Sequence, residues 1–278
     1  MFSTIRFHEK GASIIELLIC LVIASVLVTF MTRFFVAQNR ISHIEEQVSF
    51  MQENVRLAME IITRDVMNAG TGIPSGEGVF PLIPGDGASG SSDSLVIMAN
   101  FDYQYTELFE DEQVDQTIHV MNATGFYVGG LLYIEDFDGG AFHTITSITL
   151  DTPKEDQITV SQPLNRPFQK DDTVVSPIAR VSYGLTWTEQ GRPSLVRTVK
   201  GSGAKVLAEN IEDLQFSFIM SDGSETSQPA DMTEVRLVKI QMTARTEKAD
   251  CEFVDDGYRR RTLESIVQPR NLDLQCHK

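Results

Sequence analysis

Residues 11–31 read GASIIELLICLVIASVLVTFM, a segment that is apolar almost throughout and carries one carboxylate, Glu16, near its start. The 21 residues from Ala12 to Thr32 contain no Pro or Gly. At about 1.5 Å per residue, a helix of this length crosses a hydrocarbon core of about 30 Å. The segment is longer than the apolar region of a cleavable secretory signal, and no small-x-small cleavage pattern follows it. The sequence therefore predicts a transmembrane helix over residues 12–32, and basic residues on both sides leave its orientation open.

Glu16 has a local explanation at the start of this helix. Ser13 and Glu16 have the spacing of a capping box, in which each side chain accepts a hydrogen bond from a free backbone amide. A carboxylate in the first turn is also stabilised by the helix dipole. A structural role as a helix cap is therefore one interpretation of Glu16.

The residues around Glu16 support a second interpretation. The segment Lys10–Leu18, KGASIIELL, follows a short polar leader and runs directly into the apolar helix. It resembles the processing site of type IV prepilins, with Gly at the end of the leader, Glu at the fifth mature position and an apolar run after it. The resemblance implies that a prepilin peptidase removes the leader, residues 1–11, by cutting between Gly11 and Ala12. It also implies N-methylation of Ala12, which stands where Phe is commonest in the family.

The same resemblance implies that Ser13 and Glu16 guide subunit docking, with Glu16 paired to the N-terminal amine of a neighbouring subunit. A charge at the centre of a membrane helix costs roughly 2.5 to 3.5 kcal/mol, and less near the interface. An ion pair at 4 Å with an effective dielectric near 20 contributes about 4 kcal/mol. Glu16 is thus tolerable in a membrane and better satisfied beside a partner, and this role is compatible with a helix cap.

No Pro or Gly interrupts residues 12–69, which permits one helix of about 58 residues, on the order of 85 Å long. Beyond residue 33, apolar residues recur at alternating spacings of three and four. They are Ile41, Ile44, Val48, Met51, Val55, Ala58 and Ile62. We expect this stripe to be covered by a globular head, with a free-standing coiled coil as the alternative.

Strand patterns dominate after residues 70–93, which hold seven Gly and three Pro and are predicted to be a connecting loop. Short apolar runs or alternating apolar residues occur at 95–101, 131–135, 181–187, 214–220 and 238–244. Gly191-Arg192-Pro193 is expected to turn a hairpin toward Leu195. The predicted fold class is α+β, a long N-terminal helix packed on an antiparallel β-sheet head of residues 94–278.

Three further stretches are similar to the PilW group of minor pilins. They are Arg64–Gly70 (RDVMNAG), Leu207–Phe216 (LAENIEDLQF) and Pro269–Leu272 (PRNL). The resemblance implies a pilin-like fold, insertion in the inner membrane with an extracytoplasmic head, and incorporation into a pilus after processing. The implied function is a minor subunit that primes or caps type IV pilus assembly. Its implied partners are the prepilin peptidase, other minor and major pilins, the inner-membrane assembly platform and the lipid bilayer.

Two alternatives to the minor pilin stay open. One is a J-type pseudopilin, which is also a prepilin-like protein but belongs to a type II secretion system instead of a pilus. The other is a signal-anchored extracytoplasmic binding or adhesion protein, in which Glu16 only caps a helix.

The formal charge of −16 lies almost wholly after residue 69, so the head is acidic and no nucleic-acid partner is expected.

Catalytic and metal-binding patterns are sparse. The five His residues are scattered, no enzyme activity is predicted and no cofactor is expected. Asp136 and Asp138 are the candidate calcium ligands, although a plain Asp-Gly turn is the preferred interpretation. Outside the cytoplasm, Cys251 and Cys276 are able to form a disulfide worth roughly 3 to 4 kcal/mol in the chain-entropy model.

Overall fold

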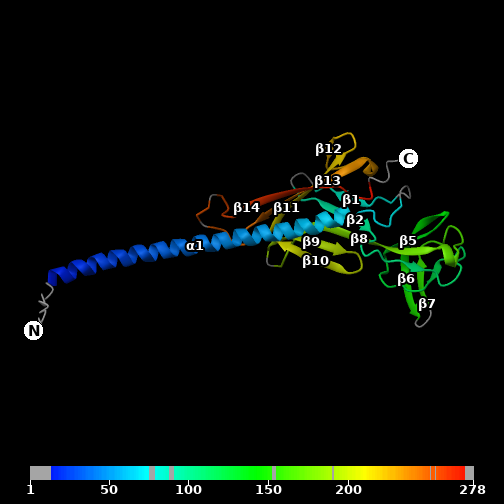
Figure 1. Ribbon diagram of the computed structural model, residues 1–278, viewed down its shortest axis with the longest axis horizontal. Helices are drawn as coiled ribbons and strands as arrows, with labels where there is room; N and C mark the ends of the chain where they lie inside the picture. Colours follow the sequence, from blue (N-terminus) through cyan, green and yellow to red (C-terminus); the bar gives the residue numbers. More distant parts are fainter. Residues whose placement is uncertain are drawn as a thin grey trace, which may run out of the picture. The chain divides into compact units, whose positions relative to one another are not determined.

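The computed structural model describes residues 14–74, 79–87, 91–151, 155–189, 191–250, 252–253 and 255–272. The chain divides into two units, Met1–Ser49 and Phe50–Lys278. The architecture of the described residues is α+β, with one long apolar helix near the N-terminus and antiparallel sheets after it (Figure 1).

The helix α1 (Ile14–Met67) is 54 residues long and, as its sequence without Pro or Gly predicts, has no break. It stops just before Gly70, whose φ of +80° is a conformation that residues with a side chain rarely adopt. The Gly70 amide donates to the Met98 carbonyl at 3.0 Å, which ties the end of the helix to the strand β2 (Ser94–Ala99). A β-carbon at Gly70 would lie 3.2 Å from both Pro81 and Asn271.

In the first unit, α1 exposes its apolar side chains all round. Every large apolar residue from Ile14 to Val36 is at least 53% exposed. The helix is long and apolar enough to span a membrane, and none of its most apolar window is buried within the protein.

In the second unit, α1 buries one face. Met51, Val55, Ala58 and Ile62 are each at most 5% exposed, in agreement with the apolar stripe in the sequence. The stripe does not stay buried at its predicted start, where Ile41 is 49% exposed. Burial from Met51 onward favours the first of the two predicted alternatives, a helix covered by its own head. It does not favour a free-standing coiled coil.

The strands in the described part of the second unit form two antiparallel sheets. The first has the hydrogen-bonded order β1-β2-β8-β5-β6-β7-β4, with β9 and β3 also paired to β8 and β10 paired to β9. Its strands are β1 (Leu82–Gly85), β2 (Ser94–Ala99), β3 (Thr106–Glu107), β4 (Thr117–Val120), β5 (Leu131–Asp136), β6 (Gly139–Asp151), β7 (Glu155–Val160), β8 (Val174–Trp187), β9 (Pro193–Val199) and β10 (Gly203–Glu209). The second sheet, β12-β11-β13-β14, comprises β11 (Ile211–Met220), β12 (Glu225–Thr226), β13 (Val235–Arg245) and β14 (Arg260–Val267). Two short 3-10 helices, η1 (Lys170–Asp172) and η2 (Met232–Glu234), precede β8 and β13.

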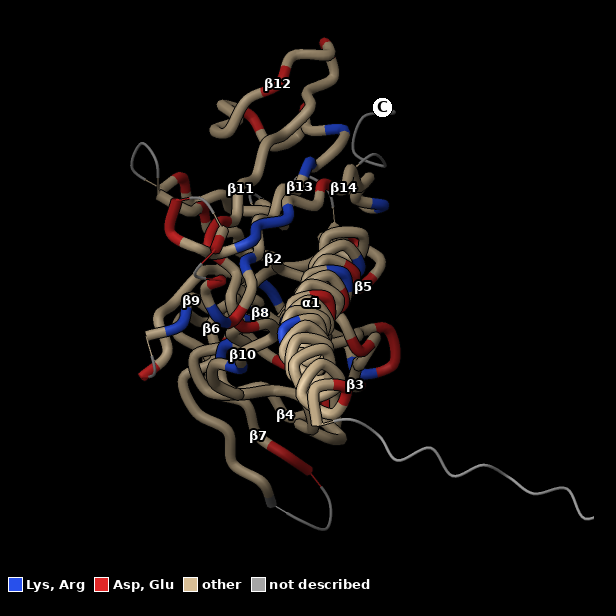
Figure 2. The backbone as a smooth tube through the Cα atoms, turned by 90° about the vertical axis from the view of Figure 1, so that its left-hand side faces the viewer, with Lys and Arg blue, Asp and Glu red and all other residues tan. Residues whose placement is uncertain are grey.

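The strands predicted from short apolar runs lie in β2 and β5, and those predicted from alternation lie in β8, β11 and β13. The hairpin at Gly191 is also confirmed, with Trp187 of β8 opposite Pro193 of β9. In the second sheet, Phe216 pairs with Ile240 on the buried face and Gln215 pairs with Gln241 on the other face. Figure 2 shows acidic and basic residues interspersed around β11, β13 and β14, where several of them form ion pairs.

A hydrophobic core separate from α1 lies within β4 to β8, the segments that join them and the segment between β3 and β4. It contains Leu108, Ile118, Val120, Leu132, Ile134, Ile145, Ile158, Val160, Leu164, Phe168 and Val175, all at most 2% exposed. None of these residues comes from α1. This part of the head is thus stabilised by its own apolar contacts.

In its described residues, 70–74, 79–87 and 91–93, the predicted loop contains one short strand, β1. Its four residues pair antiparallel with β2, and Leu82 is fully buried. Pro84 lacks an amide, which an edge strand tolerates because one side of its backbone needs no partner. A prediction based only on the Gly and Pro content therefore missed a strand at the edge of the sheet.

Candidate functional site

The apolar start of α1 is the first part of the candidate site. Glu16 lies in its first turn and is exposed, and it is the only acidic or basic residue between Ile14 and Thr32. Among the described residues it has no ion-pair or hydrogen-bond partner, so its charge is open to a group outside them. Gly11, Ala12 and Ser13, the other residues of the predicted processing and docking site, lie outside the described residues.

The hydroxyl groups within the apolar part of α1 are satisfied by the helix itself. Ser25 Oγ donates to the Val22 carbonyl at 2.7 Å, and Thr29 Oγ1 donates to the Ser25 carbonyl at 2.8 Å. Thr32 Oγ1 bonds to the Val28 carbonyl in the same way. Such bonds to the preceding turn remove the need for water, which suits a helix in lipid.

The cysteines contribute no described disulfide. Cys20 is a free, exposed thiol on the apolar part of α1. Cys251 and Cys276, which the sequence makes candidates for a disulfide, lie outside the described residues.

A buried polar triad joins the last turn of α1 to the first sheet. Tyr183 of β8 donates its hydroxyl to Asp65 Oδ2 at 2.5 Å, and Arg197 of β9 donates its Nε to the same oxygen at 2.9 Å. The Arg197 Nε also lies 3.1 Å from the Tyr183 oxygen. In Figure 1 the end of α1 lies alongside β2, β8 and β9, as these contacts require. The triad therefore ties the helix to the head by directional bonds in addition to apolar packing.

Burial and charge set the ionisation of the triad. Burial, together with the neighbouring Asp65 carboxylate, raises the pKa of the Tyr183 hydroxyl far above its ordinary value of 10. Burial also opposes the charge of Arg197, but the hydrogen bond and the attraction from Asp65 outweigh it and raise the Arg197 pKa. The Asp65 side chain is only 4% exposed, whereas that of Arg197 is 25% exposed. The triad is thus an ion pair between a buried Asp65 and a partly exposed Arg197, with a neutral Tyr183 beside it.

Sequence reasoning missed this triad, although it contains one usable signal. Asp65 follows Val55, Ala58 and Ile62 at the same alternating spacing of three and four, so it occupies the next position of the apolar stripe. A carboxylate on a stripe that is buried needs a partner. The two partners stand 118 and 132 residues further along the chain, where no local pattern marks them.

The end of α1 is fastened a second time by the segment Pro269–Leu272. The Arg270 amide donates to the Met67 carbonyl at 3.2 Å, and Asn271 Nδ2 donates to the Ala69 carbonyl at 3.3 Å and to Thr71 Oγ1 at 2.9 Å. These bonds satisfy carbonyls that the end of a helix leaves free. Arg64–Gly70 and Pro269–Leu272, two of the three stretches singled out in the sequence, therefore lie in direct contact.

Asp136 and Asp138, the candidate calcium ligands, lie at the tip of the hairpin formed by β5 and β6. Arg166 donates from both terminal nitrogens to the two carboxylate oxygens of Asp136, and its Nη2 donates to the Gly139 carbonyl at 2.7 Å. The hydrogen bond from Arg166 lowers the pKa of Asp136. The Asp138 amide donates to Asp136 Oδ1 at 2.8 Å, which is the turn that the preferred interpretation predicts. Among the described residues, no group of three or more His, Cys, Asp or Glu is placed to hold a metal ion.

The two described histidines of the head, His119 and His143, lie in different surroundings. His119 Nδ1 lies 3.0 Å from Glu112 Oε1, and burial raises the pKa of that nearly buried carboxyl. His143 is 8% exposed, and burial lowers its pKa. Within the described residues, neither histidine is hydrogen-bonded to a Ser, Thr or Cys side chain of the kind that nucleophilic catalysis uses.

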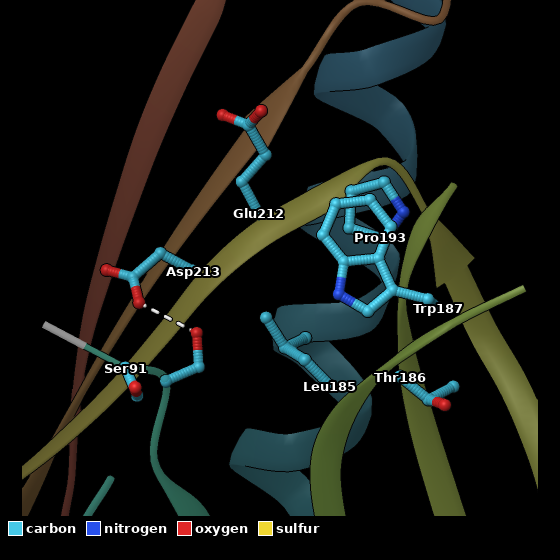
Figure 3. Close-up of a pocket in the computed structure, with 8 residues that line it drawn as sticks. Ser91, Leu185, Thr186, Trp187, Pro193, Glu212 and Asp213 are labelled. Carbon is cyan, nitrogen blue, oxygen red and sulfur yellow. Dashed lines mark hydrogen bonds between the residues drawn. The ribbon is translucent and has the colours of Figure 1, made fainter. Parts of the chain in front are cut away.

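An open pocket lies where β8, β9 and β11 meet, and we call it the Trp187 pocket (Figure 3). It has a volume of about 520 Å³ and is lined by Ser91, Ser92, Leu185, Thr186, Trp187, Pro193, Glu212 and Asp213. Trp187, the only tryptophan in the sequence, is 68% exposed. Nothing in the sequence pattern singled out this pocket, because its walls come from four separate segments.

Comparisons of the chain with protein-family models, with curated proteins and with solved structures found no match. Function is therefore inferred from the residues of the chain and their geometry.

Proposed function

We propose that this protein is a prepilin of the type IV class and acts as a minor pilin of the PilW group. In this proposal the prepilin peptidase cuts after Gly11, and α1 holds the subunit in the inner membrane with the head outside the cytoplasm. The subunit then primes or caps a pilus by joining other pilins at the assembly platform. Its work is assembly, not turnover of a substrate.

One combination of features carries the proposal. The prepilin-like junction at Gly11 and Ala12 leads directly into a helix whose apolar side chains are exposed, with Glu16 as the single charged residue of the span. The same helix then buries a face within the β-sheet head. A helix cap alone explains the place of Glu16 but not the leader that precedes it.

Glu16 has the physical properties that docking requires. An exposed carboxylate in lipid is costly, and an amine from a second subunit contributes a comparable amount when the two groups pair. Cleavage after Gly11 creates that amine at Ala12 of each subunit. The proposal thus links processing and docking through one reaction.

The mature N-terminus tests the processing step. The full chain is expressed with its native prepilin peptidase, and the N-terminal peptide is identified by mass spectrometry. We expect a peptide that begins at methylated Ala12. A chain that still begins at Met1 would refute the proposal and favour the signal-anchored binding protein. A Gly11→Val variant, which places a branched side chain at the cut, is expected to remain full-length.

A pair of matched variants tests the docking step. Glu16→Ala is expected to leave membrane insertion intact and to remove the subunit from sheared pili, whereas Glu53→Ala, an exposed acid farther along α1, is expected to be recovered normally. Equal recovery of both variants would argue against the Glu16 ion pair.

Deletion of the whole gene distinguishes a role in a type IV pilus from a role in type II secretion. Fewer surface pili support the minor pilin, and loss of protein secretion with normal pili supports the J-type pseudopilin.

A further inference from the structure

The Trp187 pocket has an apolar wall and a charged wall. Trp187 and Leu185 of β8 and Pro193 of β9 form the apolar wall, and Asp213 of β11 lies across from them (Figure 3). Trp is enriched at the centre of protein interfaces because its large ring buries much area with few rotatable bonds. A ring that is 68% exposed beside an open pocket has this surface available.

The two carboxylates at the pocket differ in their partners. Glu212 accepts hydrogen bonds from Arg245 Nη1 at 3.0 Å and from Arg260 Nε at 2.6 Å, so its charge is neutralised within the head. Asp213 Oδ1 accepts from the Ser92 hydroxyl at 2.9 Å and from Gln215 Nε2 at 2.8 Å, and both donors are neutral. Among the described residues Asp213 has no Lys or Arg partner. The pocket therefore presents one uncompensated negative charge, on Asp213.

The charged wall is held in place before any ligand arrives. The buried Asp93 accepts from the Phe216 amide at 2.9 Å, and the Asp93 amide donates to the Leu214 carbonyl at 2.8 Å. The Ser92 hydroxyl bonds to Asp213, as the dashed line in Figure 3 marks, and accepts a bond from the Leu214 amide at 3.3 Å. These bonds fix the Ser91–Ser92 edge on β11. A ligand then loses little affinity to ordering of the pocket.

An arginine side chain has chemical groups that suit each of the two walls. Its planar guanidinium stacks on a Trp ring and donates hydrogen bonds to a carboxylate oxygen, and its methylene stem covers apolar surface. On Asp213 the oxygen open to such a donor is Oδ2, because Oδ1 already accepts from Ser92 and Gln215. A head that carries most of the formal charge of −16 also attracts basic partners over longer distances. A neutral sugar is able to stack on Trp187, but it leaves the charge on Asp213 uncompensated.

We propose that the Trp187 pocket binds an arginine side chain presented by a protein partner. This inference concerns the surface of the head and does not rest on processing at Gly11. It gives Trp187 and Asp213 the roles of stacking surface and charge partner.

The single tryptophan makes the test local, because all indole emission of the full-length protein in detergent micelles comes from Trp187. The probe is the blocked peptide acetyl-Gly-Ser-Arg-Ser-Gly-amide, and its control is the same peptide with citrulline, the neutral isostere of arginine. We expect a saturable change in emission with the arginine peptide, at least tenfold weaker binding of the citrulline peptide, and affinity that falls as salt increases. Equal binding of the two peptides, or no response to the arginine peptide up to 20 mM, overturns the proposal.

Two variants locate the charge. Asp213→Asn keeps an oxygen that can accept from Ser92 and removes the charge, so we expect about tenfold weaker binding of the arginine peptide. Asp171→Asn, an exposed acid on η1 outside the pocket lining, is expected to bind as the native protein does. Native affinity in Asp213→Asn contradicts the assigned role. The peptide comparison uses native protein and stands even where a variant fails to fold. A saturable response to maltotriose without a response to the arginine peptide assigns the pocket to carbohydrate and overturns the proposal.

Discussion

Replacement of Arg197 by Met tests whether the buried triad fastens α1 to the head. The variant keeps a long side chain but removes the cation, so Asp65 is left with only the Tyr183 hydroxyl as partner. Breaking a buried ion pair costs about 3–5 kcal/mol. Because the Arg197 side chain is 25% exposed, water reaches part of the pair, and we expect a loss of about 3 kcal/mol, at the low end of this range.

The matched control is Lys205→Met on β10. Lys205 is exposed and lies directly opposite Arg197 in the β9–β10 register, so the same chemical change is made on the neighbouring strand without a buried partner. We expect the control to change stability by less than about 0.5 kcal/mol.

Urea unfolding of the full-length protein in micelles, followed by Trp187 emission, measures both variants. With a slope of about 2 kcal/mol per M, a loss of 3 kcal/mol lowers the midpoint by about 1.5 M. Asp65→Leu combined with Arg197→Met removes both charges and is expected to be more stable than Arg197→Met alone. An Arg197→Met midpoint equal to that of Lys205→Met would refute the argument, as would a double variant less stable than the single one.

Three further outcomes follow from the packing and the ionisation of the head. Ile62→Ala, at a fully buried position, is expected to lose about 2–5 kcal/mol in urea unfolding, and Leu57→Ala, at a 52% exposed position on the same helix, less than about 1 kcal/mol. Gly201→Ala is expected to lower the melting temperature, because a β-carbon there would lie 2.5 Å from Tyr127 Cδ2 at a φ of +94°. Since the Tyr183 pKa is raised on folding, its stability contribution is complete below pH 10 and is lost as the pH rises above 10, where the unfolded tyrosine ionises. Unfolding curves between pH 10 and 11 are therefore expected to show a shallower loss of stability in Tyr183→Phe than in the native protein.

The parts of the fold that the sequence predicts are those with an unbroken period. The helix has no Pro or Gly to interrupt it, and residues 181–187 of β8, 214–218 of β11 and 238–244 of β13 alternate apolar with polar or small side chains. Burial follows this alternation in β11 and β13, whereas β8 also contains a run of four buried residues, 175–178. The strands β4, β6 and β7 escaped prediction. They are rich in Thr, Ser and charged residues, and their apolar members become a core only when paired with one another. These strands form because they pair with one another, and local composition does not mark them.

The candidate site divides in the same way. The docking role of Glu16 stays a prediction, and it was drawn from residues adjacent to Glu16 in the sequence. The triad of Asp65, Tyr183 and Arg197 and the Trp187 pocket could not be predicted, because each brings together side chains from separate strands. Only Asp65 had a local signal, its position on the apolar stripe.

Two of the acids in α1, Glu16 and Asp65, differ in how their charge is compensated. A carboxylate away from water requires a counter-charge or hydrogen-bond donors. Asp65 has both within its own chain, from Arg197 and Tyr183. Glu16 has neither among the described residues, in a span with no other charged side chain. Substitution of Asp65 should therefore destabilise the head in an isolated subunit, whereas substitution of Glu16 should leave the unfolding curve of the head unchanged and affect only association between subunits. If Glu16→Ala lowered the urea midpoint of the isolated subunit, the acid would be serving its own fold, and the docking role would lose its physical basis.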